Sequence, residues 1–146
     1  MIYRWVLKPA FWLLLHSLFR LSARGVENVP RGPVIVAASH LSLLDSLFIP
    51  VLHARRFDFL AKVDYFESWK TAWLLKAAGQ IPLGRGEDAA ASLHAALEVL
   101  RAGGLVAIYP EGTRSPDGRL YKARTGVAKL ALMSGAPVVP VRRQGQ

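Results

Sequence analysis

The sequence predicts an α/β fold in which helices flank a layered sheet. Short apolar runs alternate with segments of helical periodicity, and the runs are continuously apolar, as in strands covered on both faces. No internal repeat or long linker divides the chain, which therefore forms one domain. The candidate strands are residues 34–38, 57–61, 105–109 and 138–141.

Two helices are predicted between these strands. Residues 88–101 have apolar side chains at helical spacing, and Gly103 follows as a C-terminal stop signal. A shorter helix is expected to start near Thr125 and to end at Gly135. The apolar face of the longer helix consists of Leu93, Ala96, Leu97 and Leu100.

The composition is that of a basic domain with a single core. The chain has 146 residues, 52% of them hydrophobic, and no cysteine, so it has neither disulfides nor a thiol nucleophile. The formal net charge of +9 indicates an anionic partner, either a lipid surface or an anionic substrate. Nucleic acid is disfavoured because the basic residues are scattered and no nucleic-acid-binding signature is present.

Residues 1–22 are predicted to form a helix that lies in a membrane interface. Their longest stretch without Lys, Arg, Asp or Glu has eleven residues, whereas a spanning helix needs about 20 mostly apolar ones. The alternative is a helix that packs on the core of the domain formed by residues 23–146. The interfacial prediction rests on a polar stripe, recurring at multiples of four on an otherwise apolar, aromatic-rich helix, made of Arg4, Lys8, His16 and Arg20.

A histidine and an aspartate five positions apart follow the first predicted strand. An imidazole titrates near neutral pH, and a carboxylate bonded to one ring nitrogen fixes the tautomer in which the other nitrogen can accept a proton. His40 and Asp45 are therefore predicted to be a general base and its orienting acid, a pair that can activate a hydroxyl group. The alternative is a capping box, because Ser42 and Asp45 are three residues apart at a possible helix N-terminus.

A second polar segment follows the predicted strand 105–109. It places Glu111 and Arg114, of opposite charge, in a turn beside a hydroxyl group. Ligand sites in α/β folds gather at the carboxyl ends of strands, and both His40 and Glu111 come directly after such runs. Residues 114–119 contain the Pro-Asp-Gly sequence of an exposed loop.

Four polar or proline-containing blocks occur in order along the chain, at residues 40–45, 79–85, 111–114 and 136–141. These blocks resemble those of the glycerolipid acyltransferases, the family of 1-acylglycerol-3-phosphate acyltransferases. Lys62 also matches a lysine that the family has between its first two blocks. The resemblance covers residues 34–141 and implies the layered sheet of the glycerol-3-phosphate acyltransferases. Residues 23–146 would form the acyltransferase domain. Because domains of the family continue beyond the fourth block, the C-terminal part of this domain is expected to be missing from the chain.

The resemblance implies transfer of a fatty acyl group from an acyl thioester to the free sn-2 hydroxyl of 1-acylglycerol-3-phosphate, which gives phosphatidic acid. The donor would be acyl-coenzyme A or acyl carrier protein, and no cofactor is expected. The protein would work at the cytoplasmic face of a membrane. Two alternatives stay open: an acyltransferase for another lysophospholipid or lipid alcohol, and a non-catalytic, membrane-peripheral lipid-binding module.

Specific residues follow from this interpretation. His40 would be the base and Asp45 its orienting acid. The acceptor phosphate would be held by Lys62, Arg85 and Arg114, although Lys62 and Arg85 could equally be surface charges. The substrate would be positioned by Glu111, which orients Arg114 or the glycerol, and by Gly112 and Thr113, which offer backbone amides and a hydroxyl group. No metal is expected, and the histidines assigned structural roles are His16, His53 and His94.

Overall fold

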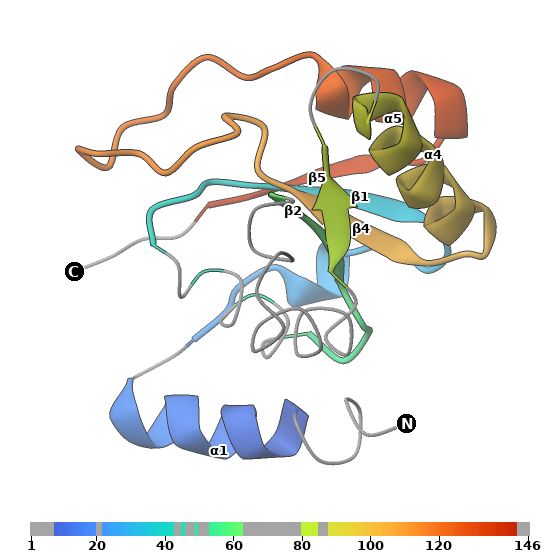
Figure 1. The fold of residues 1–146 in the computed structure, drawn as a ribbon. Helices are drawn as coiled ribbons and strands as arrows, with labels where there is room; N and C mark the ends of the chain where they lie inside the picture. The colour runs from blue at the N-terminus through green and yellow to red at the C-terminus, as the bar shows by residue number, and fades with distance from the viewer. Residues whose placement is uncertain are drawn as a thin grey trace.

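The fold is a parallel sheet with two helices on one face (Figure 1). It is seen in a computed structural model of the chain. The residues that the structure describes are 8–19, 22–42, 45, 49, 53–62, 80–84 and 88–142.

Five strands form the sheet, in the order β3-β2-β4-β1-β5. All of its strand pairs are parallel. The four predicted strands are confirmed to within one residue at each end, whereas β3 was not predicted as a strand. Both edge strands contain a proline, Pro82 in β3 and Pro140 in β5, which suits strands that need pair on one side only. The strands are β1 (Val34–Ala38), β2 (Asp58–Lys62), β3 (Ile81–Leu83), β4 (Leu105–Ile108) and β5 (Val138–Val141).

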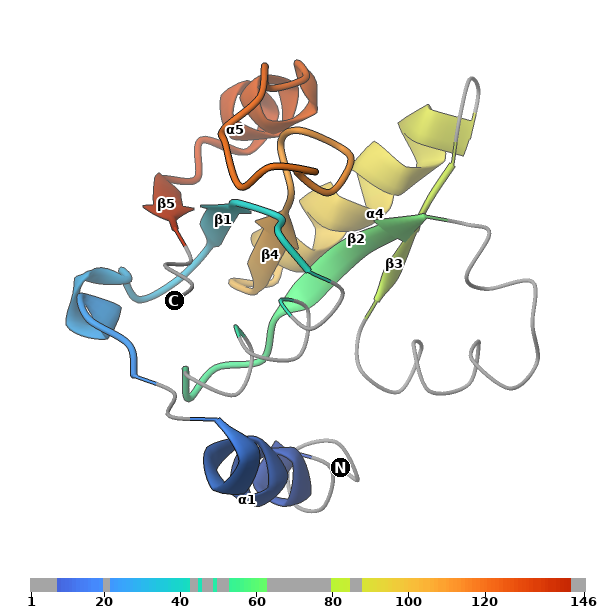
Figure 2. The same cartoon turned by 90° about the vertical axis from the view of Figure 1, so that its left-hand side faces the viewer.

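Helices α4 (Asp88–Arg101) and α5 (Gly126–Ser134) lie together on one face of the sheet (Figure 2). Both match the predicted helices. Gly135 ends α5 with φ of 66°, a left-handed conformation that glycine adopts without steric cost. The core on this side combines side chains of β1 and β4 that face the helices with the apolar faces of α4 and α5. It includes Ile35, Val106, Leu97, Leu100 and Leu130.

The opposite face of the sheet has its own apolar cluster. Side chains alternate along a strand, so the neighbours of Ile35 and Val106 point to this second face. Its buried members are Val34, Val36, Phe57, Phe59, Leu105 and Ala107. A short 3-10 helix, η2 (Val26–Asn28), precedes β1.

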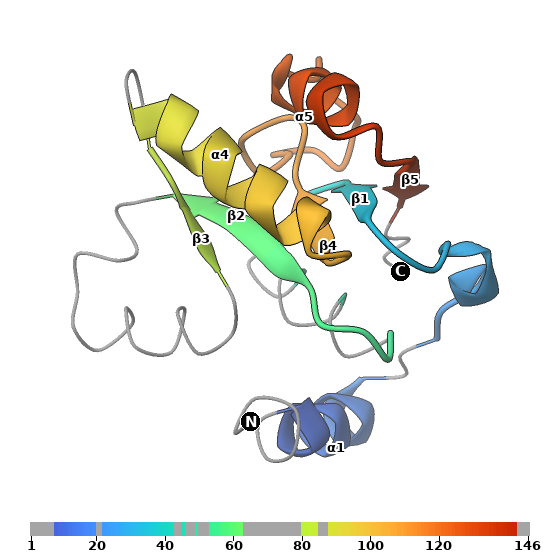
Figure 3. The same cartoon turned by 90° about the vertical axis from the view of Figure 1, so that its right-hand side faces the viewer.

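Helix α1 (Lys8–Leu18) lies on the side of the sheet away from α4 and α5 (Figures 1 and 3). It falls within the predicted N-terminal helix. Of the predicted polar stripe, Arg4, Arg20 and the Lys8 side chain lie outside the described residues, while His16 stacks on Trp12 with ring centroids 4.3 Å apart. Within the described part of the chain, no helix has the length and apolarity to cross a membrane.

Candidate active site at the carboxyl edge of the sheet

Four neighbouring strands bring the predicted site segments to one edge of the sheet. Because all strands are parallel, their carboxyl ends lie together. Crossing the sheet from β3 to β1, the ends of these strands carry or are followed by Gly84, Lys62, Glu111 and His40. The sheet therefore gathers four segments that are far apart in the sequence.

Asp45 is almost completely buried, with 1% of its surface exposed, and one of its oxygens is shared by three groups. Its Oδ2 accepts hydrogen bonds from the backbone amides of Leu41 and Ser42, both at 2.7 Å. The same oxygen lies 3.4 Å from His40 Nδ1. The capping contact with Ser42 and the histidine contact, alternatives in the sequence, thus occur together.

The imidazole of His40 also lies against an aromatic ring. Its centroid is 3.9 Å from that of Tyr109, and the planes differ by 18°. The backbone of His40 is tied to the turn after β4, because the Ser115 amide donates to the His40 carbonyl at 2.8 Å. The candidate base is therefore attached to the same turn that carries Glu111 and Arg114.

This turn begins with a tight bend after β4. The Gly112 amide donates to the Tyr109 carbonyl at 3.0 Å, with Pro110 second and Gly112 fourth in the bend. Gly112 has φ of 68°, and a Cβ atom added there would lie 2.9 Å from Nε of Arg124. Both the backbone conformation and the Arg124 side chain thus favour glycine at this position.

Glu111 is buried, and its carboxylate accepts a hydrogen bond from the backbone. Its Oε2 accepts a hydrogen bond from the Tyr121 amide at 3.0 Å. Within the described residues no ion pair joins Glu111 to Arg114. Since the Arg124 amide also donates to the Pro110 carbonyl at 2.8 Å, residues 121–124 fold back onto the turn. The contact observed for Glu111 is one that organises the loop.

Ser115 and Asp117 organise the exposed loop that follows. Ser115 Oγ donates to the Arg119 carbonyl at 2.8 Å, and the Arg119 amide donates to Asp117 Oδ1 at 3.1 Å. This backbone hydrogen bond lowers the pKa of the Asp117 carboxyl. Partial burial, then the interaction with Asp117, raises the pKa of the Tyr121 phenol. The predicted exposed loop is confirmed, apart from its buried residue Ser115.

The predicted phosphate ligands are described to different extents. Arg114 and Thr113 are exposed on the turn after β4. Lys62 ends β2 and pairs with Leu83 of β3, but its side chain lies outside the described residues, as does all of Arg85. The residue before Arg85, Gly84, donates its amide to Ser92 Oγ at 3.0 Å.

Three residues near the site were not singled out from the sequence. Tyr109 stacks on His40, Arg124 lies across Gly112, and Ser92 of α4 bonds to the end of β3. The one available signal for Tyr109 is its position directly after a predicted strand, but its contact with His40 needs the strand order, which only the structure shows. The contacts of Arg124 and Ser92 depend on how distant segments fold back, which carries no local sequence signal.

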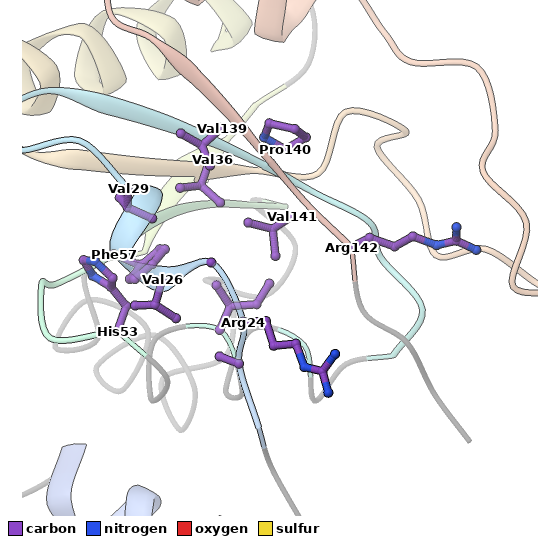
Figure 4. Close-up of a pocket in the computed structure, with 13 residues that line it drawn as sticks. Arg24, Val26, Val29, Val36, His53, Phe57, Val139, Pro140, Val141 and Arg142 are labelled. Carbon is purple, nitrogen blue, oxygen red and sulfur yellow. The ribbon is translucent and has the colours of Figure 1, made fainter.

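An apolar recess of about 200 Å³ opens on the face of the sheet opposite α4 and α5 (Figure 4). Its walls include Val26, Val36, Phe57 and Val139, and the Arg24 and Arg142 side chains extend from its rim. His40 is not among its lining residues. The recess nevertheless reaches the same edge, because Val141 in its wall accepts a hydrogen bond from the amide of Ser39, the residue before His40.

The side chains of the described site do not form a metal cluster. In the part of the chain that the structure describes, no group of three or more His, Cys, Asp and Glu residues is close enough to hold a metal ion. The groups at hand are an imidazole with its carboxylate and a basic turn. These can move a proton and bind an anion.

The fold and site define an α/β protein with a histidine–aspartate pair and a basic turn at the carboxyl edge of a parallel sheet. The family model described as Acyltransferase matches residues 20–144, and the chain belongs to this family.

Two relatives are similar to the chain over most of its length. The chain is 30% identical, over 135 residues, to the chloroplastic 1-acyl-sn-glycerol-3-phosphate acyltransferase of Arabidopsis thaliana. The match covers 90% of this chain and 38% of that protein. The chain is also 30% identical, over 141 residues, to the 1-acyl-sn-glycerol-3-phosphate acyltransferase of Pseudomonas aeruginosa, covering 90% of this chain and 52% of that one. The chain thus spans about half or less of these relatives' lengths.

A solved structure shares the fold. The crystal structure of the 1-acyl-sn-glycerophosphate acyltransferase from Thermotoga maritima superimposes with a TM-score of 0.66 at 23% identity. The match covers 97% of this chain and 76% of that one. The predicted fold class is confirmed.

Proposed function

We propose that the protein transfers a fatty acyl group from an acyl thioester to the sn-2 hydroxyl of 1-acylglycerol-3-phosphate, giving phosphatidic acid. The observation that carries the proposal is the attachment of His40, facing Asp45, to the turn that bears Arg114. A base for a hydroxyl group and a cation for a phosphate are both required to acylate a phosphorylated glycerol. The names of the relatives agree with this acceptor.

His40 acts as the general base in this proposal. With Nδ1 toward Asp45, Nε2 takes the proton of the acceptor hydroxyl as its oxygen attacks the thioester carbonyl carbon. The carbon–sulfur bond then breaks, the thiolate leaves, and the imidazolium returns its proton to the thiolate. Asp45 stabilises the imidazolium between these steps. A thiolate is a good leaving group, so the proposed reaction needs no metal or cofactor.

Cations at the carboxyl edge bind the acceptor phosphate. The Arg114 guanidinium is exposed, and a guanidinium can hold a phosphate through two parallel hydrogen bonds. Lys62 ends β2, and Arg85 comes two residues after the end of β3 in the sequence. The net charge of +9 adds a general attraction for an anionic lipid.

The acyl donor, as acyl-coenzyme A or acyl carrier protein, places its chain against apolar surface. The recess along β1 and β5 is such a surface, and the Arg24 and Arg142 side chains at its rim suit an anionic donor. The recess reaches the residue that precedes His40. These features support the donor binding on the face of the sheet opposite α4 and α5.

The protein works at a membrane surface, on the cytoplasmic face. Helix α1 exposes Trp12, Leu13, Leu14 and Leu18, a large apolar surface for a helix in water. Tryptophan and leucine side chains suit the boundary between lipid head groups and acyl chains. The lipid acceptor of the proposed reaction would be reached from this surface.

The first test is acyl transfer from radiolabelled long-chain acyl-coenzyme A to micellar lysophosphatidic acid. Wild type is compared with His40→Ala and with His94→Ala, a matched histidine loss on the exposed face of α4. We expect His40→Ala to lower turnover by about 10²–10⁴-fold, the usual contribution of a general base, while His94→Ala keeps wild-type turnover.

Two outcomes would redirect the proposal. Turnover that His40→Ala leaves intact would reject His40 as the base. Binding of the chain to anionic vesicles without turnover, in the wild type and in a longer form of the protein, would instead indicate a lipid-binding module. Competition among acceptors with and without a phosphate monoester then tests the acceptor, because an acyltransferase for another lipid alcohol would not prefer the phosphorylated one.

A further inference from the structure

We propose that Tyr109 is a positioning residue that holds the His40 imidazole through ring stacking. The inference rests on the proposed role of His40 as the base. It concerns what sets the plane of the ring, a requirement for proton transfer that the Asp45 contact alone does not meet. No substrate contact of Tyr109 is involved.

Strand geometry brings the two rings together. His40 is two residues beyond Ala38 and shares its face of the sheet, and Tyr109 is likewise two beyond Ala107. Strands β1 and β4 are adjacent, and the register that pairs Ala37 with Ile108 puts Tyr109 level with Ala38, on the same face of the sheet and two residues before His40. The two rings are thus diagonal neighbours, and their centroids lie 3.9 Å apart. They differ by 18° in plane, a stacked arrangement.

A second aromatic ring supports Tyr109 from the other side. Phe59 of β2 is buried at 1% exposure and stacks on Tyr109 with centroids 5.7 Å apart. The row Phe59, Tyr109, His40 thus crosses three adjacent strands, β2, β4 and β1, with Tyr109 in the middle. A ring anchored in the core on one side presents a fixed surface to His40 on the other.

The carboxylate of Asp45 is a weak guide for the imidazole. Its Oδ2 already accepts two backbone amides at 2.7 Å, and His40 Nδ1 approaches it only to 3.4 Å. Ordinary N–H···O hydrogen bonds have heavy-atom distances of about 2.7–3.2 Å. The short contacts of Asp45 fix the chain after His40, and the aromatic stack fixes the ring.

Stacking has a second consequence once the base has taken its proton. The face of an aromatic ring attracts a cation, so the Tyr109 ring favours the imidazolium that forms during the reaction. The Tyr109 carbonyl also accepts the Gly112 amide of the turn that bears Arg114. Tyr109 therefore links the candidate phosphate-binding turn to the base.

The test combines kinetics of three variants. Tyr109→Leu removes the stacking ring, Tyr109→Phe keeps it, and Phe59→Leu removes an aromatic ring from the same row without removing the ring that contacts His40. We expect Tyr109→Leu to lower kcat by about 2- to 13-fold with little change in the acceptor KM, because an aromatic stacking pair contributes about 0.5–1.5 kcal/mol. Tyr109→Phe should restore kcat, and Phe59→Leu, which removes the support of Tyr109 but keeps the ring that stacks on His40, should lower kcat by less than Tyr109→Leu does.

Nuclear magnetic resonance of the His40 ring protons tests the stack without turnover. A proton above an aromatic face is shifted upfield, and the His40 signals are identified by their loss in His40→Ala. We expect an upfield shift in wild type and in Tyr109→Phe that disappears in Tyr109→Leu. Unshifted His40 signals in wild type would overturn the proposal even if Tyr109→Leu did not fold. A shift without acyl transfer in wild type would count against the proposed function alone.

Discussion

Two arginines at opposite ends of the sheet differ in their hydrogen bonding: Arg55 is bonded to the backbone, whereas Arg114 is exposed. At the amino end, the Arg55 guanidinium donates to the carbonyls of Pro30 and Gly103, at 2.9 and 3.0 Å, and to that of Gly32. At the carboxyl end, the Arg114 guanidinium is exposed and, among the described residues, forms no hydrogen bond or ion pair. The first arginine is used by the fold, whereas the second is available to a ligand.

This difference follows from what surrounds each end. The amino end is where the segments that precede β1, β2 and β4 meet, and their turns present backbone carbonyls that need donors. The carboxyl end is built instead around Asp45 and Glu111, whose carboxylates accept backbone amides. At the amino end, the guanidinium of Arg55 donates to the backbone carbonyls. At the carboxyl end, the buried carboxylates of Asp45 and Glu111 accept from the backbone amides, and the guanidinium of Arg114 is exposed.

Arg55→Ala should have the largest effect on stability. It would leave carbonyls of two turns without their donor, and we expect the free energy of unfolding to fall by about 2–4 kcal/mol. Chemical denaturation measures this loss. The matched control is Arg56→Ala, which removes a half-exposed ion pair with Asp58 and should cost about 0–1 kcal/mol. Equal losses for the two variants would mean that the hydrogen bonds of Arg55 do not stabilise the amino end of the sheet more than a surface ion pair does.

Arg114→Ala should affect binding and leave stability unchanged. We expect the acceptor KM to rise by about 10–100-fold, because a hydrogen bond to a charged group contributes about 1.5–3 kcal/mol. Initial rates at varied acceptor and donor concentrations measure this change. Arg119→Ala, an exposed arginine whose Nε lies 3.7 Å from Asp117, is the control and should leave both constants unaltered. A rise in the donor KM as large as that for the acceptor would argue against a phosphate role.

Gly112→Ala should have the smallest effect of the three and sharpens the description of the carboxyl end. Gly112 and Gly118 both have positive φ, but an added Cβ meets Arg124 at Gly112 and nothing within 4 Å at Gly118. We therefore expect Gly112→Ala to cost up to about 1 kcal/mol more than Gly118→Ala in thermal denaturation. The excess should vanish in an Arg124→Ala background, since the cycle isolates that contact. An unchanged excess would mean that Arg124 does not pack on Gly112.

The candidate pair and most of the elements could be predicted from the sequence. His40 and Asp45 are joined by a short segment, so a local pattern sufficed to propose their contact. Helix α4 was predicted because its apolar face repeats at helical spacing. Strand β3 was missed because it has only three residues, one of them Pro82, too few for an alternating pattern.

Side-chain contacts between distant segments could not be predicted from local sequence patterns. The carboxylate of Glu111 accepts the amide of Tyr121, ten residues away, a contact that no local pattern predicts, while its role toward Arg114 or the glycerol stays a prediction. The stacking of Tyr109 on His40 needs β4 to lie beside β1, an order that the sequence of strands does not reveal. The three-way use of Asp45 Oδ2 likewise depends on how the chain bends after β1.

The sequence by itself determined the α/β class, the four longer strands, two helices and the nearness of His40 to Asp45. Periodicity and turn chemistry are local, so the identity of a segment can be read from the residues within it. Only the tertiary structure decided the strand order, the aromatic row beneath the base, and which arginine serves the fold. Those depend on contacts between distant segments, whose energies are settled by packing across the whole domain.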